Sequence, residues 1–239
     1  MILKQGFDTL LNFLKNFAAL AYPGTCCACG TLLIAYEKHL CLHCRALLPK
    51  TRFHKFRENQ LTKIFWGRLQ LETGTSLFYF QKGGKVQRLI HQFKYKGDTQ
   101  LGFYLGQLLG RDIKSSPYYN GIDCILPVPL HQMKERHRGF NQSEVVAGGI
   151  ASSLLLPCTK HLLIRKEYTE TQTRKNRFNR WQNVADVFET PVPDALVNKS
   201  VLLVDDVITT GSTLEACAQK LLAIKGVKVW IATLAITNE

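Results

Sequence analysis

Two adjacent carboxylates near the C-terminal end of the chain, Asp205 and Asp206, are followed by a short loop rich in hydroxyl groups. An apolar run at residues 201–204 precedes the acids, and residues 209–213 read Thr-Thr-Gly-Ser-Thr before a helical pattern begins. The backbone N–H groups and hydroxyls of such a loop, with the dipole of the following helix, make a cradle for a phosphate monoester. Acids just before the cradle hold sugar hydroxyls or a hydrated Mg²⁺ ion. The spacing therefore suggests a ligand that contains a ribose 5-phosphate unit.

Other interpretations of this motif account for less of it. The motif lacks the lysine of a Walker A loop, and no G-x-G-x-x-G follows a predicted strand, so neither a P-loop nor a dinucleotide fold is indicated. A phospho-receiver domain would use the acid pair but would leave the hydroxyl-rich loop without a role. A plain helix cap is the remaining interpretation, since hydroxyl-rich turns after strands commonly cap helices.

Four of the eight cysteines form two C-x2-C pairs separated by 11 residues. Two thiolate pairs at this spacing can close a tetrahedron around zinc, and four protein ligands leave no position for a catalytic water. We therefore expect a structural zinc module whose metal supplies its folding energy. Cys27 can replace Cys26, and His39 or His43 can replace a cysteine; a redox disulfide or a set of buried free thiols would also explain the pattern. The simplest ligand set is Cys26, Cys29, Cys41 and Cys44.

Basic and aromatic residues are interleaved directly after the cysteine pairs. Residues 45–68 hold seven Lys or Arg side chains against one acid, Glu58, and five aromatic or imidazole rings stand among them. This pattern suits single-stranded nucleic acid, because bases stack on rings while phosphates meet the cations. The alternative is an ordinary linker whose aromatic residues pack on the next domain. The candidate nucleic-acid contacts here are Arg52, Lys55 and Arg57.

The elements that must position these groups alternate between short apolar strands and longer helices. Strands are predicted at 76–80, 122–126, 162–164, 201–204 and 227–235, and helices at 85–93, 101–113, 141–155 and 212–224. This alternation predicts βαβ units and a mainly parallel sheet with flanking helices, an α/β fold. Ligands of such sheets bind beyond the carboxyl ends of the strands, so the loops after residues 126 and 204 are the expected site.

Composition narrows the class of protein and the kind of partner. With 46% hydrophobic residues the chain has material for a core, and a net charge of +13, from 31 Lys and Arg against 18 Asp and Glu, favours an anionic partner. The cysteine spacing and the lack of a cleavage pattern indicate the reducing cytoplasm. We expect an amphipathic helix at 1–24, either packed on the protein or touching a membrane surface, with no transmembrane segment. The predicted division continues with a zinc module at 25–50, a basic-aromatic linker at 51–74 and the α/β domain at 75–239.

The motif at residues 201–213 resembles the phosphoribosyl-diphosphate (PRPP) signature of type I phosphoribosyltransferases. The cysteine pairs and the segments 93–97, 127–130 and 136–143 resemble the ComF family, and this resemblance covers nearly the whole chain from Cys26. It implies a zinc module ahead of a type I phosphoribosyltransferase-like domain that binds PRPP with Mg²⁺. ComF proteins are linked to handling of incoming single-stranded DNA during natural transformation, so DNA and the competence machinery are the implied partners.

Carried over to this sequence, the resemblance places Asp205 and Asp206 on the ribose hydroxyls and the following loop on the 5-phosphate. Cations neutralise the departing pyrophosphate, and a movable lid at 165–183 excludes water, although a solvated basic helix is the alternative for that segment. Phosphoribosyl transfer, non-catalytic binding of PRPP and DNA, and regulation by PRPP are the open functions. The phosphate residues are Thr209, Thr210, Gly211, Ser212 and Thr213; the pyrophosphate and lid residues are Lys134, Arg136, Arg138, Gln172 and Arg177; Arg174 and Arg180 are further candidates for DNA.

Overall fold

The computed structural model describes residues 24–34, 36–166 and 187–237. The chain falls into two compact units, one ending at Leu48 and the other beginning at Pro49. The helix expected at 1–24 and the lid expected at 165–183 lie almost entirely outside the described residues. Among the described residues, no helix combines the length and the apolar character needed to cross a membrane.

The first unit is a small module built around its cysteines. Two isolated backbone bridges precede helix α2 (Leu42–Leu47), whose first turn is capped by the Cys41 side chain. Cys26 and Cys44 are buried together with Ala28 and Leu40. Because so few apolar side chains are buried in a segment this short, its thiols have to contribute to its folding.

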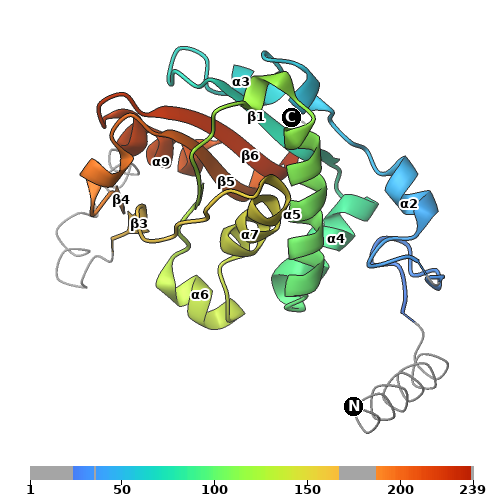
Figure 1. Ribbon diagram of the computed structural model, residues 1–239. Helices are drawn as coiled ribbons and strands as arrows, with labels where there is room; N and C mark the ends of the chain where they lie inside the picture. The colour runs from blue at the N-terminus through green and yellow to red at the C-terminus, as the bar shows by residue number, and fades with distance from the viewer. Residues whose placement is uncertain (1–23, 35, 167–186, 238–239) are drawn as a thin grey trace, which may run out of the picture. The chain divides into compact units, whose positions relative to one another are not determined.

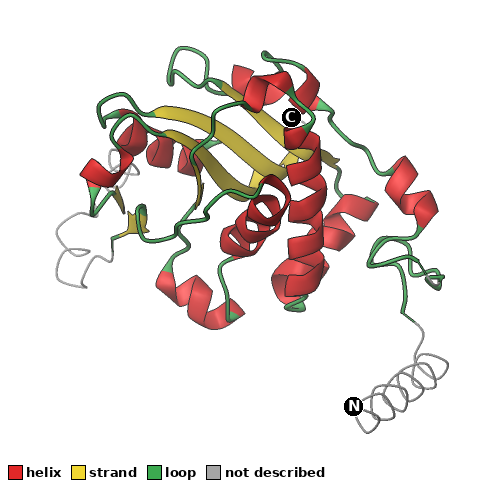
Figure 2. Cartoon of the chain, in the orientation of Figure 1, coloured by secondary structure: helices red, strands yellow, loops and turns green. Residues whose placement is uncertain are grey.

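The second unit is built on a parallel sheet of four strands (Figure 2). The strands are β1 (Thr73–Phe80), β2 (Cys124–Pro127), β5 (Ser200–Ile208) and β6 (Lys228–Thr237), in the spatial order β1-β6-β5-β2. The two central strands, β5 and β6, are buried along most of their length, as expected for a sheet covered on both faces. The predicted α/β fold with a parallel sheet is therefore confirmed.

Helices cover both faces of this sheet (Figure 1). Three of them lie on one face, namely α4 (Lys85–Tyr95), α5 (Thr99–Lys114) and α7 (Gln142–Leu154), and α9 (Ser212–Leu222) lies on the other. Apolar residues of η1 (Phe53–Lys55) and α3 (Gln60–Lys63) share one core cluster with those of α9. Two further short turns in the described part of the chain are η2 (Pro117–Tyr119) and η4 (Pro193–Leu196).

Helices α5 and α7 approach each other so closely that glycine is required at the crossing. A Cβ atom at Gly149 would collide with the carbonyl oxygen of Phe103, and one at Gly106 would collide with the carbonyl oxygen of Val146. This contact between two backbones holds α7 firmly, and α7 in turn packs on β5 and β2. The start of α7 is thereby fixed beside the carboxyl end of β5.

Three elements differ from the prediction. The strand expected near 162–164 is β3 (Ile164–Arg165), which pairs antiparallel with β4 (Phe188–Glu189) outside the parallel sheet. A helix, α6 (Gln132–Arg138), stands where a loop was expected, because the side chain of His131 caps its first turn and Gly139 ends it with a φ of +80°. Strand β5 continues to Ile208, so the acid pair lies within the strand and not beyond it.

Candidate functional site

The acid pair lies near the carboxyl end of the central strand β5. The four residues before it, at positions 201–204, are fully buried, and the chain then presents Asp205 and Asp206 at the edge of the core. The backbone N–H of Asp206 donates a hydrogen bond to Oδ1 of Asp205 at 2.8 Å. The strand thus delivers two neighbouring carboxylates to the position where α/β proteins bind ligands.

Asp205 is held by the first turn of α7. The hydroxyl of Ser143 donates to Oδ1 of Asp205 at 2.8 Å. Burial, followed by the neighbouring Asp206 carboxylate, raises the pKa of Asp205 to about 7, while the Ser143 hydrogen bond and Lys94 act in the opposite direction. Asp205 can therefore exchange a proton near neutral pH, and a bound cation would favour its ionised form.

Asp206 is paired with a lysine from helix α4. The ammonium of Lys94 lies 2.8 Å from Oδ2 of Asp206, and the two side chains are only 18% and 12% exposed. Two carboxylates that already attract a cation suit Mg²⁺, which prefers oxygen ligands and keeps several waters. The donor set at the end of β5 therefore fits the metal that the family resemblance implies.

The loop after the acids forms a small hollow at the start of α9. Asp205, Val207 and Ile208 line it together with the whole Thr209–Leu214 segment. Gly211 is the N-cap residue of α9, with a φ of +78° and no side-chain hydrogen bond to the first turn, while the hydroxyls of Thr210 and Ser212 lie 3.2 Å apart. Hydroxyls and the positive end of a helix dipole thus face one hollow, which is an arrangement suited to phosphate.

Gly211 is also required by its surroundings. A Cβ atom there would lie 3.0 Å from the ring of Phe65 and from Ile64 Cγ2. Phe65 is 1% exposed and belongs to the core cluster beneath α9. The hydroxyl-rich loop therefore packs on Phe65 and Ile64, which belong to the segment that was predicted to be a linker.

The cations proposed for pyrophosphate lie on helix α6 instead of a loop. Arg136 is exposed, whereas Arg138 donates to Oε1 of Gln142 at 2.8 Å and lies 5.5 Å from the ring centroid of Tyr95. Since Gln142 directly precedes Ser143, Arg138 is tied to the turn that holds Asp205. The side chain of Lys134 is outside the described part of the chain, as are Gln172, Arg174, Arg177 and Arg180.

The four expected thiols come together in the first unit. The sulfur atoms of Cys26, Cys29, Cys41 and Cys44 all lie within 4.8 Å of one another, and those of Cys29 and Cys41 are 3.7 Å apart. Ligands about 2.3 Å from a tetrahedral zinc lie about 3.8 Å from one another, so the cluster fits the metal. Hydrogen bonding with Thr31 lowers the pKa of Cys29 to about 6, which favours a thiolate at neutral pH. Cys27 does not belong to this group of four thiols.

The basic-aromatic segment belongs to the second unit, and its residues divide into two sets. Phe53, His54 and Phe65 are buried, whereas Phe56 and Trp66 are 58% and 57% exposed. The exposed Trp66 borders a pocket of about 220 Å³. Three of the five rings therefore belong to the buried part of the fold, and the other two are accessible.

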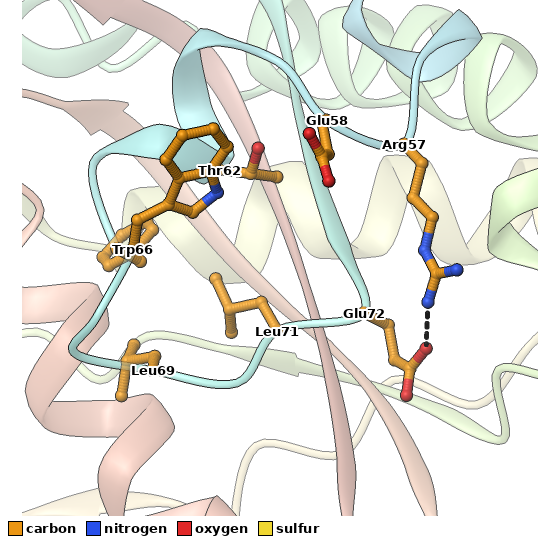
Figure 3. Close-up of a pocket in the computed structure, with 8 residues that line it drawn as sticks. Arg57, Glu58, Thr62, Trp66, Leu69, Leu71 and Glu72 are labelled. Carbon is orange, nitrogen blue, oxygen red and sulfur yellow. Dashed lines mark ion pairs between the residues drawn. The ribbon is translucent and has the colours of Figure 1, made fainter.

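Figure 3 shows Trp66 on one side of this pocket and an ion pair between Arg57 and Glu72, 3.7 Å apart, on the other. Glu58 and Leu71 also line it. Of the other two candidate cations, Arg52 caps η1 with a φ of 58°, and Lys55 ends that turn and is exposed. The structure thus brings only Arg57 of these three into the lining of the pocket.

Two residues of the site, Lys94 and Ser143, were not selected from the sequence. Both lie in segments that were noted only for their family resemblance, and both reach the acids through the packing of helices on the sheet. A signal for Lys94 was present, since it follows Val86 and Ile90 at helical spacing on the buried stripe of α4. A lysine in such a position calls for a carboxylate partner.

A parallel sheet with paired acids on a central strand and a hydroxyl-rich loop after it is the arrangement expected of a phosphoribosyltransferase-like domain. A family model described as a phosphoribosyl transferase domain matches residues 141–239, which include α7, the acid pair and the loop. This part of the chain is therefore similar to a phosphoribosyl transferase domain.

Three curated relatives are similar to this chain. Competence protein F of Haemophilus influenzae is 32% identical over 148 residues, which are 59% of this chain and 65% of the relative. DNA utilization protein YhgH of Escherichia coli is 29% identical over 218 residues, 89% of this chain and 91% of the relative. Competence protein ComFC of Bacillus subtilis is 29% identical over 138 residues, 57% of this chain and 53% of the relative. The matches to Competence protein F and ComFC thus span less than two thirds of those proteins.

Proposed function

We propose that this protein binds PRPP with Mg²⁺ at the carboxyl end of β5 and acts in the use of incoming DNA in the cytoplasm. The names of its relatives, which refer to competence and to DNA utilization, support the biological setting. The phosphoribosyl transferase domain supports the class of ligand.

One observation carries the choice of ligand. Asp205 and the start of α9 border a single hollow, one short loop apart, and Asp206 is the next residue on β5. In the proposed complex, Asp205 and Asp206 receive the ribose hydroxyls and contact the hydrated metal, and the Thr209–Thr213 loop holds the 5-phosphate. Arg138, which donates a hydrogen bond to Gln142 beside Ser143, would meet the diphosphate, and Mg²⁺ would neutralise the remaining charge.

A thermal-shift titration tests this function. Ligand that binds only the folded protein raises the melting temperature as its concentration rises. PRPP with Mg²⁺ should stabilise the wild-type protein and should not stabilise Asp206→Asn, whereas Asp194→Asn, an exposed acid on η4, should respond as the wild type does. Lack of any stabilisation by PRPP would remove the proposal.

A measurement of turnover distinguishes an enzyme from a protein that only binds PRPP. Pyrophosphate release from PRPP should be measured against a panel of nucleobase and amine acceptors, with and without single-stranded DNA. Release with one acceptor identifies a phosphoribosyltransferase. Tight binding without release identifies a protein that senses or anchors PRPP.

The accessible part of the basic-aromatic segment supports a second function, binding of single-stranded DNA. Trp66 offers an exposed ring at the mouth of a pocket, the ammonium of Lys63 lies 5.6 Å from that ring, and Arg57 borders the same pocket. Base stacking on an aromatic ring contributes about 1–3 kcal/mol per base. A strand that stacks one base on Trp66 would place its phosphates within reach of these cations.

Binding of a fluorescent oligonucleotide at several salt concentrations tests this second function. Trp66→Ala should weaken binding by about tenfold, and the triple variant of Arg52, Lys55 and Arg57 to Ala should reduce the salt dependence as well. Phe103→Ala, which removes another partly exposed ring on α5, serves as the control. Equal binding by the wild type and both test variants would exclude this surface.

A further inference from the structure

Lys94 supplies the cation that pairs with Asp206. It comes from the last turn of α4, and its ammonium lies 2.8 Å from Oδ2 of Asp206. Both side chains are more than four-fifths buried, so this pair is poorly screened by solvent. The carboxylate that should receive a ribose hydroxyl or a hydrated metal is thus already engaged by a cation of the protein itself.

The position of Lys94 is fixed by its neighbours on α4. Phe93 is fully buried, its ring centroid lies 5.7 Å from that of Phe140, and a Cβ atom at Gly102 would collide with it. Tyr95 lies under the guanidinium of Arg138 at 5.5 Å. The backbone of this turn is therefore held, while the four-carbon stem of Lys94 leaves its ammonium free to move by several ångströms.

The charges around the acid pair make an exchange of partners favourable. Two adjacent carboxylates at the edge of a core need a counter-ion, and Lys94 supplies one in the structure described. PRPP brings several negative charges, and its metal brings two positive ones, so binding would provide Asp206 with a new partner and Lys94 with a new anion. Arg138, which contacts Tyr95 and donates a hydrogen bond to Gln142, the residue before Ser143, would share the diphosphate.

We propose that Lys94 is an exchangeable counter-ion: its ammonium holds Asp206 before ligand binds and moves to the diphosphate of PRPP when Mg²⁺ and the ribose hydroxyls engage the acids. This inference rests on the proposed function, and it names a residue that governs the preference for a diphosphate-bearing ligand. Lys94 is thus paired with an anion in both states, first with Asp206 and then with the diphosphate.

The test compares wild type, Lys94→Met and the control Lys96→Met, an exposed lysine two residues further on. Without PRPP, Mn²⁺ binding followed by electron paramagnetic resonance should be tighter in Lys94→Met by about fivefold, because a competing cation is gone. With Mg²⁺, calorimetry should show PRPP bound about tenfold more weakly, while ribose 5-phosphate, which lacks the diphosphate, should lose little affinity. Lys96→Met should match the wild type in all three measurements.

These opposite effects separate the proposal from mere damage to the fold, which would weaken every ligand. If wild type and Lys94→Met prefer PRPP over ribose 5-phosphate to the same degree, or if Mn²⁺ binding is unchanged, the inference about Lys94 is wrong while the proposed function stands. If wild type fails to bind PRPP, the proposed function itself is wrong. Should Lys94→Met fail to fold, Lys94→Gln, which keeps a donor without the charge, replaces it with the same expectations.

Discussion

The hydroxyl of Ser143 donates a hydrogen bond to Oδ1 of Asp205 and thereby ties the first turn of α7 to the strand that carries the acid pair. The turn itself is anchored, because the side chain of Asn141 accepts from the N–H of Ser143 and donates to the carbonyl of Val128 at the end of β2. Asn141 and Ser143 are both buried. The ends of two neighbouring strands and the start of one helix are thus joined by a single polar network, which preorganises the site.

Removing the Ser143 hydroxyl should weaken ligand binding through Asp205. In Ser143→Ala, the carboxylate loses a donor that favours its ionised form, so its pKa should rise further. We expect PRPP affinity at pH 7 to fall about three- to tenfold, with a smaller loss at pH 8.5 where Asp205 is ionised in both proteins. Calorimetry at the two pH values checks this, with Ser152→Ala, an exposed serine on the same helix, as the control. An equal loss at both pH values would contradict the explanation.

PRPP affinity should itself depend on pH. The pKa of Asp205 in the ligand-free protein is raised to about 7, and a cation or hydroxyl ligand requires the carboxylate, so protons compete with the ligand below that value. Affinity should rise between pH 6 and pH 8 and then level off, with at most one proton released per ligand. In Asp205→Asn this dependence should disappear; an unchanged pH profile in that variant would assign the titration to another group.

The same shift has a consequence for stability, with a definite sign. Because the folded-state pKa lies above the unfolded value near 4, the protonated form of Asp205 is the one favoured by folding. The stabilisation that protonated Asp205 contributes to the free energy of unfolding should be fully present below about pH 4 and should be lost as pH rises through about 7. Denaturant unfolding of the ligand-free protein should therefore show less loss of stability with rising pH in Asp205→Asn than in the wild type.

Gly211 should be far less tolerant of substitution than another glycine of similar conformation. Gly211 and Gly83 have φ values of +78° and +77°, but only at Gly211 would a Cβ atom meet other atoms, at 3.0 Å from Phe65 and Ile64. We expect Gly83→Ala to lower the free energy of unfolding by about 1 kcal/mol from backbone strain alone. Gly211→Ala should cost more than that and should reduce PRPP affinity at least tenfold, because the loop has to shift. Similar behaviour of both variants in unfolding and binding would count against the proposed role of the loop.

The four-cysteine cluster should hold about one zinc ion per chain. Cys29→Ser should abolish metal binding and expose the amides of residues 24–48 to hydrogen exchange, since metal binding and folding are coupled in such modules. Cys158→Ser, at an exposed thiol outside the cluster, should retain the metal. Elemental analysis and hydrogen-exchange mass spectrometry make the comparison, and full protection of residues 24–48 without zinc would rule out a structural role for the metal.

The sequence was informative where function depends on neighbours along the chain. The apolar run before Asp205, the loop through Thr213 and the cysteine spacing are local patterns, and the structure brings each of them together as a unit. The parallel sheet followed from the alternation of strands and helices. Helix α6 was missed because its seven residues carry mostly charged and polar side chains, without an apolar stripe to reveal the period.

Contacts between segments that are far apart in the sequence could not be predicted from local patterns. Lys94 and Ser143 reach the acids from helices that are 112 and 62 residues earlier, which only the order of strands in the sheet brings together. Tertiary packing also decides which rings of the basic-aromatic segment are buried. Phe65 packs against Gly211 in the core, whereas Trp66, the next residue, is exposed. Composition alone cannot separate two adjacent rings with such different roles.

The most direct test of the central claim is calorimetric titration of PRPP into the protein, with and without Mg²⁺, for wild type and the double variant Asp205→Asn with Asp206→Asn. We predict one PRPP bound per chain in the presence of Mg²⁺, weaker binding without the metal, and at least a hundredfold loss of affinity in the folded double variant. Undiminished binding by the double variant, or no heat of binding in the wild type, would contradict the assignment of the β5–α9 hollow as a PRPP site.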